Sequence, residues 1–158
     1  MYAVSVRRTF VAQHYLTVPD PGPEGEPHSH TFTAEVELRG PELGEYGYLV
    51  DIDDVKAGVD AVVDHYRDEL LNDHAAFEGV NPSVERFARV FARSFLDVAE
   101  PSTPERLRVR LWEDDEAYAS YETAVDGAAP PREPVGDARA RASAPARDDA
   151  DGDAGADD

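Results

Sequence analysis

The spacing of apolar residues in this chain changes from a period of two to a helical period and then returns to two. Two early segments alternate as strands do, with these apolar residues: Tyr2, Val4, Val6, Phe10 and Ala12, then Phe32, Ala34, Val36 and Leu38. Two later segments repeat as helices do, with these: Val55, Val59, Val62, Val63, Tyr66 and Leu70, then Val84, Phe87, Ala88, Phe91, Phe95 and Val98. Alternation resumes at Leu107, Val109 and Leu111, and a shorter strand is expected over 118–122. The order β-β-α-α-β-β predicts an α+β fold, a four-stranded antiparallel sheet with two helices on one face.

Turn-forming residues set the limits of two of these elements. The segment 19–27 is rich in proline and glycine, so it must be a loop between the first two strands. Asn81 is followed by Pro82, and this pair is typical of a helix with asparagine as its N-cap and proline at its first helical position. We therefore expect the second helix to begin at Pro82.

The composition changes near Thr123. From residue 124 to residue 158 the chain consists mainly of Ala, Asp, Gly, Pro and Arg, and its only large apolar residues there are Val125 and Val135. Such a segment buries too little apolar surface to offset the entropy lost on ordering. We expect a folded domain over residues 1–123 and a disordered acidic tail over residues 124–158.

The charge of the chain is strongly negative. The sequence has 34 acidic and 15 basic residues, a formal net charge of −19, and Lys56 is its only lysine. A surface this negative repels phosphate backbones, so nucleic-acid binding is not expected. Many acids with almost no lysine resemble the halophilic proteins of salt-loving microbes, in which high salt screens the self-repulsion. An acidic protein from an ordinary habitat is the alternative.

Three absences narrow the function classes further. The sequence has no run of about 18 apolar residues, so no membrane span is expected. Its first residues alternate like a strand and do not resemble a signal peptide, so we expect a cytoplasmic protein. The chain also has no cysteine, which excludes disulfides, thiolate zinc ligands and thiol nucleophiles.

Three of the five histidines have positions that favour a metal site. His28 and His30 are two residues apart at the start of the second predicted strand, so both side chains point to the same side. His14 ends the first predicted strand, and the three imidazoles converge if the two strands pair as a hairpin. Three histidines without a fourth protein ligand are typical of a catalytic zinc site with an open position. Surface histidines beside a loop are the alternative.

A second metal motif also matches part of this pattern. Gly22, His28, His30 and Glu35 have the spacing that opens the cupin metal motif. Cupins are β-barrels, however, and two amphipathic helices follow here in place of further strands. Glu35 also has the opposite parity from both histidines. We therefore do not expect a cupin.

Several carboxylates are candidates for acid–base or ligand-binding roles. Glu24 and Glu26 lie in the loop before the predicted metal ligands, which brings them close to any metal-bound substrate. Asp64 and His65 are adjacent late in the first helix, where an aspartate can orient an imidazole for proton transfer. A solvated pair at the end of a helix is the alternative. Glu113 continues the core-facing parity of the third strand, and a carboxylate there needs hydrogen-bond donors, of which a ligand is one source.

These residues resemble, in order along the chain, the motifs of the 6-pyruvoyl-tetrahydropterin synthase and 6-carboxytetrahydropterin synthase family, which has the tunnelling fold. The resemblance covers residues 4–122, nearly the whole predicted domain. The matching segments are Phe10-Val11-Ala12-Gln13-His14, His28-Ser29-His30, Gly47-Tyr48-Leu49-Val50-Asp51, Asp64-His65, Leu71-Asn72, Asn81-Pro82-Ser83-Val84-Glu85, and Glu113 with Tyr121 beyond it. No single motif is decisive, but their number and order are strong evidence.

The chain departs from the family pattern at one catalytic position and in one spacing. The family usually has a catalytic cysteine four residues before the His-x-His pair, where this chain has Glu24. A branch of the family has glutamate in this loop instead, and both Glu24 and Glu26 are candidates for that residue here. The spacing from Asp64-His65 to the following Leu-Asn motif is longer than is usual in the family.

The resemblance implies a zinc-dependent lyase. The residues carried over from the family are the zinc ligands His14, His28 and His30, the pterin-binding Glu113, and the acid–base groups Asp64, His65 and Glu24 or Glu26. The glutamate branch implies cleavage of the side chain of 7,8-dihydroneopterin triphosphate to 6-hydroxymethyl-7,8-dihydropterin, a folate precursor. The alternatives are the 6-carboxytetrahydropterin synthase of the deazapurine pathway (archaeosine and queuosine), or a pterin-binding oligomer without turnover. The family also implies a homo-oligomer, a hexamer of two trimers whose subunit sheets join into a barrel.

Overall fold

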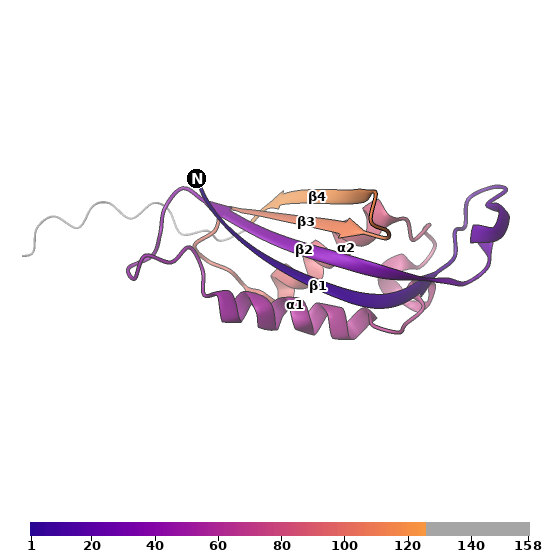
Figure 1. The fold of residues 1–158 in the computed structure, drawn as a ribbon, viewed down its shortest axis with the longest axis horizontal. Coiled ribbons are helices and arrows are strands. Elements are labelled where there is room, and N and C mark those ends of the chain that lie inside the picture. Colours follow the sequence, from indigo (N-terminus) through magenta and orange to yellow (C-terminus); the bar gives the residue numbers. More distant parts are fainter. Residues whose placement is uncertain (126–158) are drawn as a thin grey trace, which may run out of the picture.

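Four strands form one antiparallel sheet in the computed structural model, which describes residues 1–125. The strands are β1 (Tyr2–His14), β2 (His28–Gly40), β3 (Arg106–Trp112) and β4 (Tyr118–Ala124), and they lie in this order across the sheet. The helices α1 (Ile52–Tyr66) and α2 (Val84–Ala99) both cover one face of it (Figure 1). Three short 3-10 helices are η1 (Gly22–Gly25), η2 (Leu71–Asp73) and η3 (Ala75–Phe77). The predicted fold class and the order β-β-α-α-β-β are confirmed.

The first two strands pair along their whole length as the predicted hairpin. Val6 lies opposite Val36, and His14 lies opposite His28. In this register the buried apolar side chains of both strands are all even-numbered and lie beneath the helices: Val6, Phe10, Ala12, Phe32, Ala34, Val36 and Leu38. β3 pairs only with residues 33–39 of β2. The start of β2 and the end of β1 therefore extend past β3.

The second helix begins later than the sequence suggested. Its N-cap is Ser83, whose hydroxyl accepts a hydrogen bond from the Arg86 N–H at 3.3 Å. Asn81 is not the cap, because its side-chain oxygen accepts the N–H of Thr17 instead. Serine caps a helix as well as asparagine does. Pro82 therefore lies before the helix, and the asparagine is free to bind another segment.

Val98 was predicted to lie on the buried face of α2, but it is 55% exposed. The two helices approach closely at Gly58, where an added Cβ would lie 2.9 Å from the Cβ of Ala99 and 3.0 Å from the ring of Phe95. The last turns of α2 thus face α1 through Phe95 and Ala99. Val98 is turned to the solvent as a result.

Leu70 was predicted to belong to the first helix, but that helix ends at Tyr66. The chain turns at Asp68, whose backbone is left-handed with a φ of 61°. Leu70 then forms an isolated parallel bridge with Gln13 of β1. The left-handed residue ends the helical path, so Leu70 lies in an extended segment beside β1 and not on the helix.

The folded part extends past the boundary predicted at residue 123. β4 continues to Ala124, and Val125 is buried, with its N–H donating to the carbonyl of Glu105 at 2.9 Å. Val125 therefore belongs to the core, because an apolar residue directly after a strand still packs under the sheet. The rest of the predicted tail, residues 126–158, lies outside the described residues. Over residues 1–125, neither helix has the length and apolar character that crossing a bilayer requires.

The face of the sheet opposite the helices carries a network of arginine and glutamate across the strands. Glu35 on β2 is buried, and its carboxylate accepts hydrogen bonds from Arg7 on β1 and Arg110 on β3. Burial raises the pKa of Glu35, but the two guanidinium groups outweigh it, so the net pKa is lowered. Glu35 binds arginines on the face opposite the three histidines, which agrees with the rejection of the cupin motif.

Glu35→Gln should lower the free energy of unfolding by about 1–3 kcal/mol at neutral pH, because two arginines lose their charged acceptor. The pKa of Glu35 is lowered in the folded state, so this stabilisation is present above the unfolded-state pKa of about 4.3 and is lost as the pH falls. Urea unfolding at neutral pH and at about pH 3 measures it, and the difference from wild type should shrink at the lower pH.

Glu122→Gln is the matched control for Glu35→Gln. The Glu122 carboxylate also binds arginine, but its side chain is 34% exposed against 11% for Glu35. Its loss should therefore cost less than that of Glu35, because solvent screens the pair. A loss for Glu35→Gln that is equally large at both pH values would contradict an ionised Glu35 as the stabilising group.

Candidate metal centre and active site

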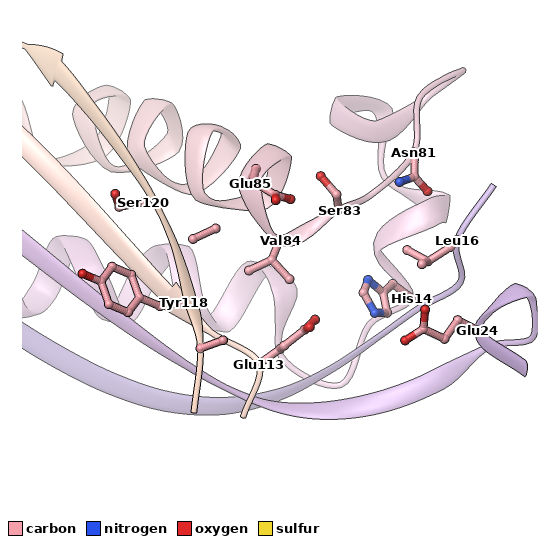
Figure 2. A pocket seen from close by; sticks show the side chains of 12 residues that line it. His14, Leu16, Glu24, Asn81, Ser83, Val84, Glu85, Glu113, Tyr118 and Ser120 are labelled. Carbon is pink, nitrogen blue, oxygen red and sulfur yellow. The ribbon is translucent and has the colours of Figure 1, made fainter. Parts of the chain in front are cut away.

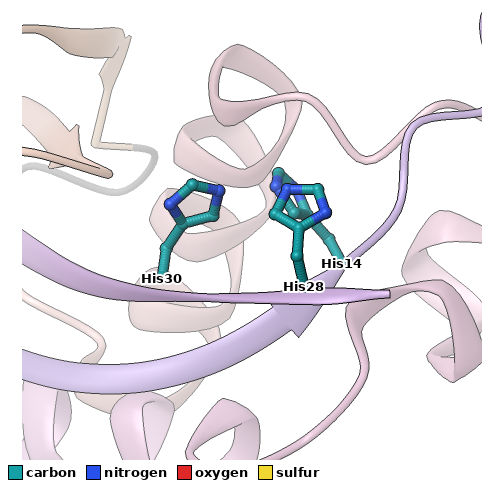
Figure 3. Close-up of side chains that lie close together, drawn as sticks. All are labelled: His14, His28 and His30. Carbon is teal, nitrogen blue, oxygen red and sulfur yellow. The ribbon is translucent and has the colours of Figure 1, made fainter. Parts of the chain in front are cut away.

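Three histidines meet where the β1–β2 hairpin extends past β3 (Figure 3). His28 and His30 stand on the same side of β2, and His14 comes from the neighbouring strand. Each ring offers one nitrogen, and these three atoms lie within 4.8 Å of one another. His14 is buried, whereas the other two are half-buried. The structure brings the three predicted residues together.

Backbone carbonyls orient two of the three rings. The Nδ1 of His14 lies 2.9 Å from the carbonyl oxygen of Pro82, and the Nδ1 of His28 lies 2.8 Å from that of Glu26. A carbonyl only accepts, so each Nδ1 carries the proton and each Nε2 keeps a free lone pair. The Nε2 of His28 is buried and has no hydrogen-bond partner within the described part of the chain. A metal ion binds an imidazole nitrogen that carries no proton and has its lone pair free, as this Nε2 does.

The charge state of His14 also suits a metal ion. Burial lowers the pKa of His14, and the neighbouring imidazoles of His28 and His30 lower it further, so the ring is neutral at neutral pH. Three imidazole nitrogens without a fourth protein ligand suit a divalent transition metal with an open coordination position. The donor set, the carbonyl-bound Nδ1 atoms and the unpartnered Nε2 therefore fit a metal ion.

A cavity of about 490 Å³ opens beside the histidines (Figure 2). Besides His14, three carboxylates from distant parts of the chain line it: Glu24 on η1, Glu85 on α2 and Glu113 directly after β3. The Oε2 of Glu113 lies 4.0 Å from the Nε2 of His30. The start of α2 forms another wall, with these lining residues: Asn81, Ser83, Val84 and Glu85. A candidate metal centre and three carboxylates thus share one space large enough for a small ligand.

The structure separates the two loop glutamates. Glu24 lines the cavity, and its backbone carbonyl accepts a hydrogen bond from the Leu16 N–H at 2.8 Å. Glu26 does not line the cavity, and its backbone carbonyl binds His28 instead. Of the two candidates, Glu24 is therefore the one whose carboxylate belongs to the space beside the histidines.

Asp64 and His65 do not line this cavity. Both are exposed near the end of α1. The Asp64 carboxylate lies 3.5 Å from the Arg67 guanidinium, and the ring of His65 packs against Tyr66 and His74. The fold of this chain does not bring the Asp-His pair to the three histidines.

Two cavity residues at the start of α2, Ser83 and Glu85, had no role predicted from the sequence. The sequence feature that could have pointed to them is the segment 81–85, which matches a family motif but does not by itself indicate a function. The contact that places them is the hydrogen bond from His14 to the Pro82 carbonyl, which holds the start of α2 against the histidines. Sequence patterns alone do not reveal such a backbone contact.

Similarity to known proteins agrees with this geometry. A family model described as 6-pyruvoyl tetrahydropterin synthase matches residues 3–124. The 6-carboxy-5,6,7,8-tetrahydropterin synthase of Bacillus subtilis is 29% identical over 117 residues, which cover 70% of this chain and 77% of that protein.

Solved structures share the fold. A Plasmodium vivax 6-pyruvoyltetrahydropterin synthase, in a variant with alanine in place of a catalytic glutamate, has a TM-score of 0.66 at 12% identity, covering 78% of this chain and 98% of that one. The Caenorhabditis elegans 6-pyruvoyl tetrahydropterin synthase has a TM-score of 0.62 at 20% identity, covering 78% and 97%. The sheet and its two helices thus form the tunnelling fold. Since the family model matches most of the sequence, the chain belongs to the 6-pyruvoyl tetrahydropterin synthase family.

Proposed function

We propose that this protein is a zinc-dependent lyase that acts on 7,8-dihydroneopterin triphosphate and cleaves its side chain to 6-hydroxymethyl-7,8-dihydropterin, a folate precursor. The observation that carries the proposal is the position of Glu24. This glutamate lines the cavity beside the three histidines, in a chain that has no cysteine. The base at this position is therefore a carboxylate and not a thiolate.

His14, His28 and His30 would hold the metal ion. A set of three histidines with an open position favours zinc. When bound, zinc would lower the pKa of the side-chain hydroxyls of the substrate. The carbonyls of Pro82 and Glu26 keep two of the rings oriented before any ligand arrives.

The nature of the base favours side-chain cleavage over isomerisation and triphosphate elimination. A carboxylate has a pKa near 4, whereas a thiol has one of about 8.5, so Glu24 is the weaker base. Removing a proton from an unactivated carbon is correspondingly harder for it, and removing one from a hydroxyl is easier. A glutamate is a catalytic residue in the Plasmodium vivax 6-pyruvoyltetrahydropterin synthase, which supports a glutamate base here.

The proposed step balances without an added oxidant or reductant. Glu24 takes the proton from the hydroxyl on the second side-chain carbon. The bond between the first and second carbons then breaks, and its electron pair stays on the first carbon. The second carbon becomes an aldehyde that keeps the triphosphate. A proton delivered to the first carbon completes 6-hydroxymethyl-7,8-dihydropterin.

Glu113 would bind the pterin ring by accepting hydrogen bonds from the ring N3–H and the 2-amino group. Glu113→Gln keeps the size but loses the charge and one acceptor, so it should raise KM about 10–100-fold and change kcat much less. Steady-state kinetics with dihydroneopterin triphosphate measure both constants. Glu116→Gln, exposed in the same turn, is the control and should change neither. A fall in kcat at constant KM would contradict ring binding by Glu113.

We also infer that the active protein is a homo-oligomer, a hexamer of two trimers. β1 and β4 are the edge strands of the described sheet, and exposed edges of this kind are usually paired or protected. Asp64 and His65 do not line the cavity of their own chain. Their role as the second acid–base pair would therefore be exerted in the cavity of a neighbouring subunit.

Incubation of the purified protein with zinc and dihydroneopterin triphosphate tests the proposed reaction. The expected main product is 6-hydroxymethyl-7,8-dihydropterin. Formation of 6-carboxytetrahydropterin and acetaldehyde would contradict it and support the second candidate, a 6-carboxytetrahydropterin synthase of the deazapurine pathway, which the similarity to the Bacillus subtilis protein favours. Pterin binding without any turnover would contradict both reactions and support a pterin-binding oligomer that is not an enzyme.

A further inference from the structure

The connection between β1 and β2, residues 15–27, carries Glu24. Connections of this length are usually mobile unless other parts of the molecule hold them. A catalytic group, by contrast, must be held within about 0.5 Å of its working position. The hydrogen bonds that tie down this connection therefore determine how well the Glu24 carboxylate is placed.

Three consecutive residues, 15–17, tie the connection to the rest of the fold, and we call them the 15–17 segment. The side chain of Asn72 binds Tyr15 twice. Its Oδ1 accepts the Tyr15 N–H, and its Nδ2 donates to the Tyr15 carbonyl, each at 3.0 Å. The Oδ1 of Asn81 accepts the Thr17 N–H at 2.9 Å. Two asparagines thus hold the two ends of the segment.

The middle residue of the segment, Leu16, transmits this support to Glu24. Its N–H donates to the backbone carbonyl of Glu24 at 2.8 Å. Because that carbonyl and the carboxylate belong to the same residue, a shift of the 15–17 segment moves the Glu24 side chain with it. Figure 2 shows Asn81, Leu16 and Glu24 on the side of the cavity where His14 lies.

The sequence has only two asparagines, and both bind the 15–17 segment. Aspartate is far commoner in this acidic chain, and its ionised side chain can only accept hydrogen bonds. Asn72 acts as a donor and an acceptor at once, which an ionised aspartate cannot do. Asn81 acts on this segment only as an acceptor. Position 72 therefore requires a side chain that both donates and accepts, whereas position 81 requires only an acceptor for this segment.

We propose that Asn72 is a positioning residue that, together with Asn81, fixes the 15–17 segment and thereby the Glu24 carboxylate. Asn72 does not line the cavity itself, so it acts through Glu24 and not on the substrate. The proposal rests on the proposed function, in which Glu24 is the base. It gives a physical role to the Leu71-Asn72 motif, which had none in the sequence.

Amide hydrogen exchange tests the structural half of this proposal without any reference to catalysis. Asn72→Leu keeps the side-chain size but makes neither hydrogen bond, so the amides of Tyr15 and Leu16 should exchange about tenfold faster or more. Asn72→Asp should also speed exchange, because it loses the donor and places a carboxylate oxygen against the Tyr15 carbonyl. Asn81→Asp is the matched control and should keep the wild-type rates because it still accepts. Unchanged exchange in Asn72→Leu would overturn the proposal.

A double-mutant cycle tests the functional half. Alone, Asn72→Leu should lower kcat about 10–100-fold with KM and bound metal nearly unchanged, since a misplacement of about 1 Å has an effect of this size. In a Glu24→Ala background it should have almost no further effect, because the group that it positions is gone.

Two outcomes of the cycle would separate the possible failures. An equal fall in kcat in both backgrounds would indicate a general structural role of Asn72 and overturn the proposal. A wild-type protein that does not turn over dihydroneopterin triphosphate would overturn the proposed function instead. In that case the exchange rates still decide whether Asn72 holds the 15–17 segment.

Discussion

His28→Ala should remove the metal ion from the protein and lower turnover by about 10³-fold or more. The substitution takes away the buried Nε2 that has no hydrogen-bond partner among the described residues. Two histidines remain, and two ligands are too few to hold zinc as a catalytic site does. Metal content per chain after dialysis, measured by elemental mass spectrometry, and turnover of dihydroneopterin triphosphate check the two parts of this prediction.

His74→Ala is the control for metal content. His74 packs against His65 and Tyr66 and is not part of the three-histidine cluster, so the variant should keep the wild-type metal content. A chelator applied to the wild type should reproduce the loss of turnover, and added zinc should restore it. Full metal content in His28→Ala would show that the ion is held elsewhere.

Glu24→Ala should lower kcat by about 10²–10⁴-fold, which is the usual contribution of a general base. Glu26→Ala should change kcat less than about threefold, because Glu26 contributes its backbone carbonyl to His28 and not a carboxylate to the cavity. Both variants should keep the metal, since neither removes a ligand. Steady-state kinetics and metal content measured on the same preparations check this pair.

The ranking of the two glutamates can be contradicted in one direct way. A larger fall in kcat for Glu26→Ala than for Glu24→Ala would reverse their roles. Glu24→Cys adds a test of the chemistry, because it places a stronger base at the position where the family usually has cysteine. We expect the product to shift from 6-hydroxymethyl-7,8-dihydropterin towards the products of C–H proton removal.

The convergence of the three histidines could be predicted from the sequence because period-two alternation contains three-dimensional information. Residues of equal parity on two paired strands face the same side, so His14, His28 and His30 had to converge once the hairpin formed. The cavity position of Glu24, by contrast, depends on the hydrogen bond from Leu16. The sequence left Glu24 and Glu26 as equal candidates because nothing in a Pro/Gly loop marks such a contact.

Some of the predictions that failed concern the ends of helices. Asparagine is common at N-caps, but Ser83 caps the helix equally well. Asn81 instead accepts the N–H of Thr17, and this contact decides which of the two residues caps the helix. Val98 has the right spacing for burial, but the close approach of the helices at Gly58 turns it outward. Both outcomes depend on contacts with segments distant in the sequence, which local patterns do not contain.

The short pairing between β3 and β2 has a consequence for the order of the three-histidine site when no metal ion is bound. Because β3 pairs with β2 only over residues 33–39, the histidines stand on a stretch where β1 and β2 have no third full strand beside them, only the bridge from Gln13 to Leu70. A two-stranded ribbon is marginally stable in water. A metal ion bound by His14, His28 and His30 would link β1 to β2 at this end of the hairpin. The demetallated protein should therefore fray at this end while the four-stranded remainder stays folded, so that metal supply would govern local order as well as reactivity.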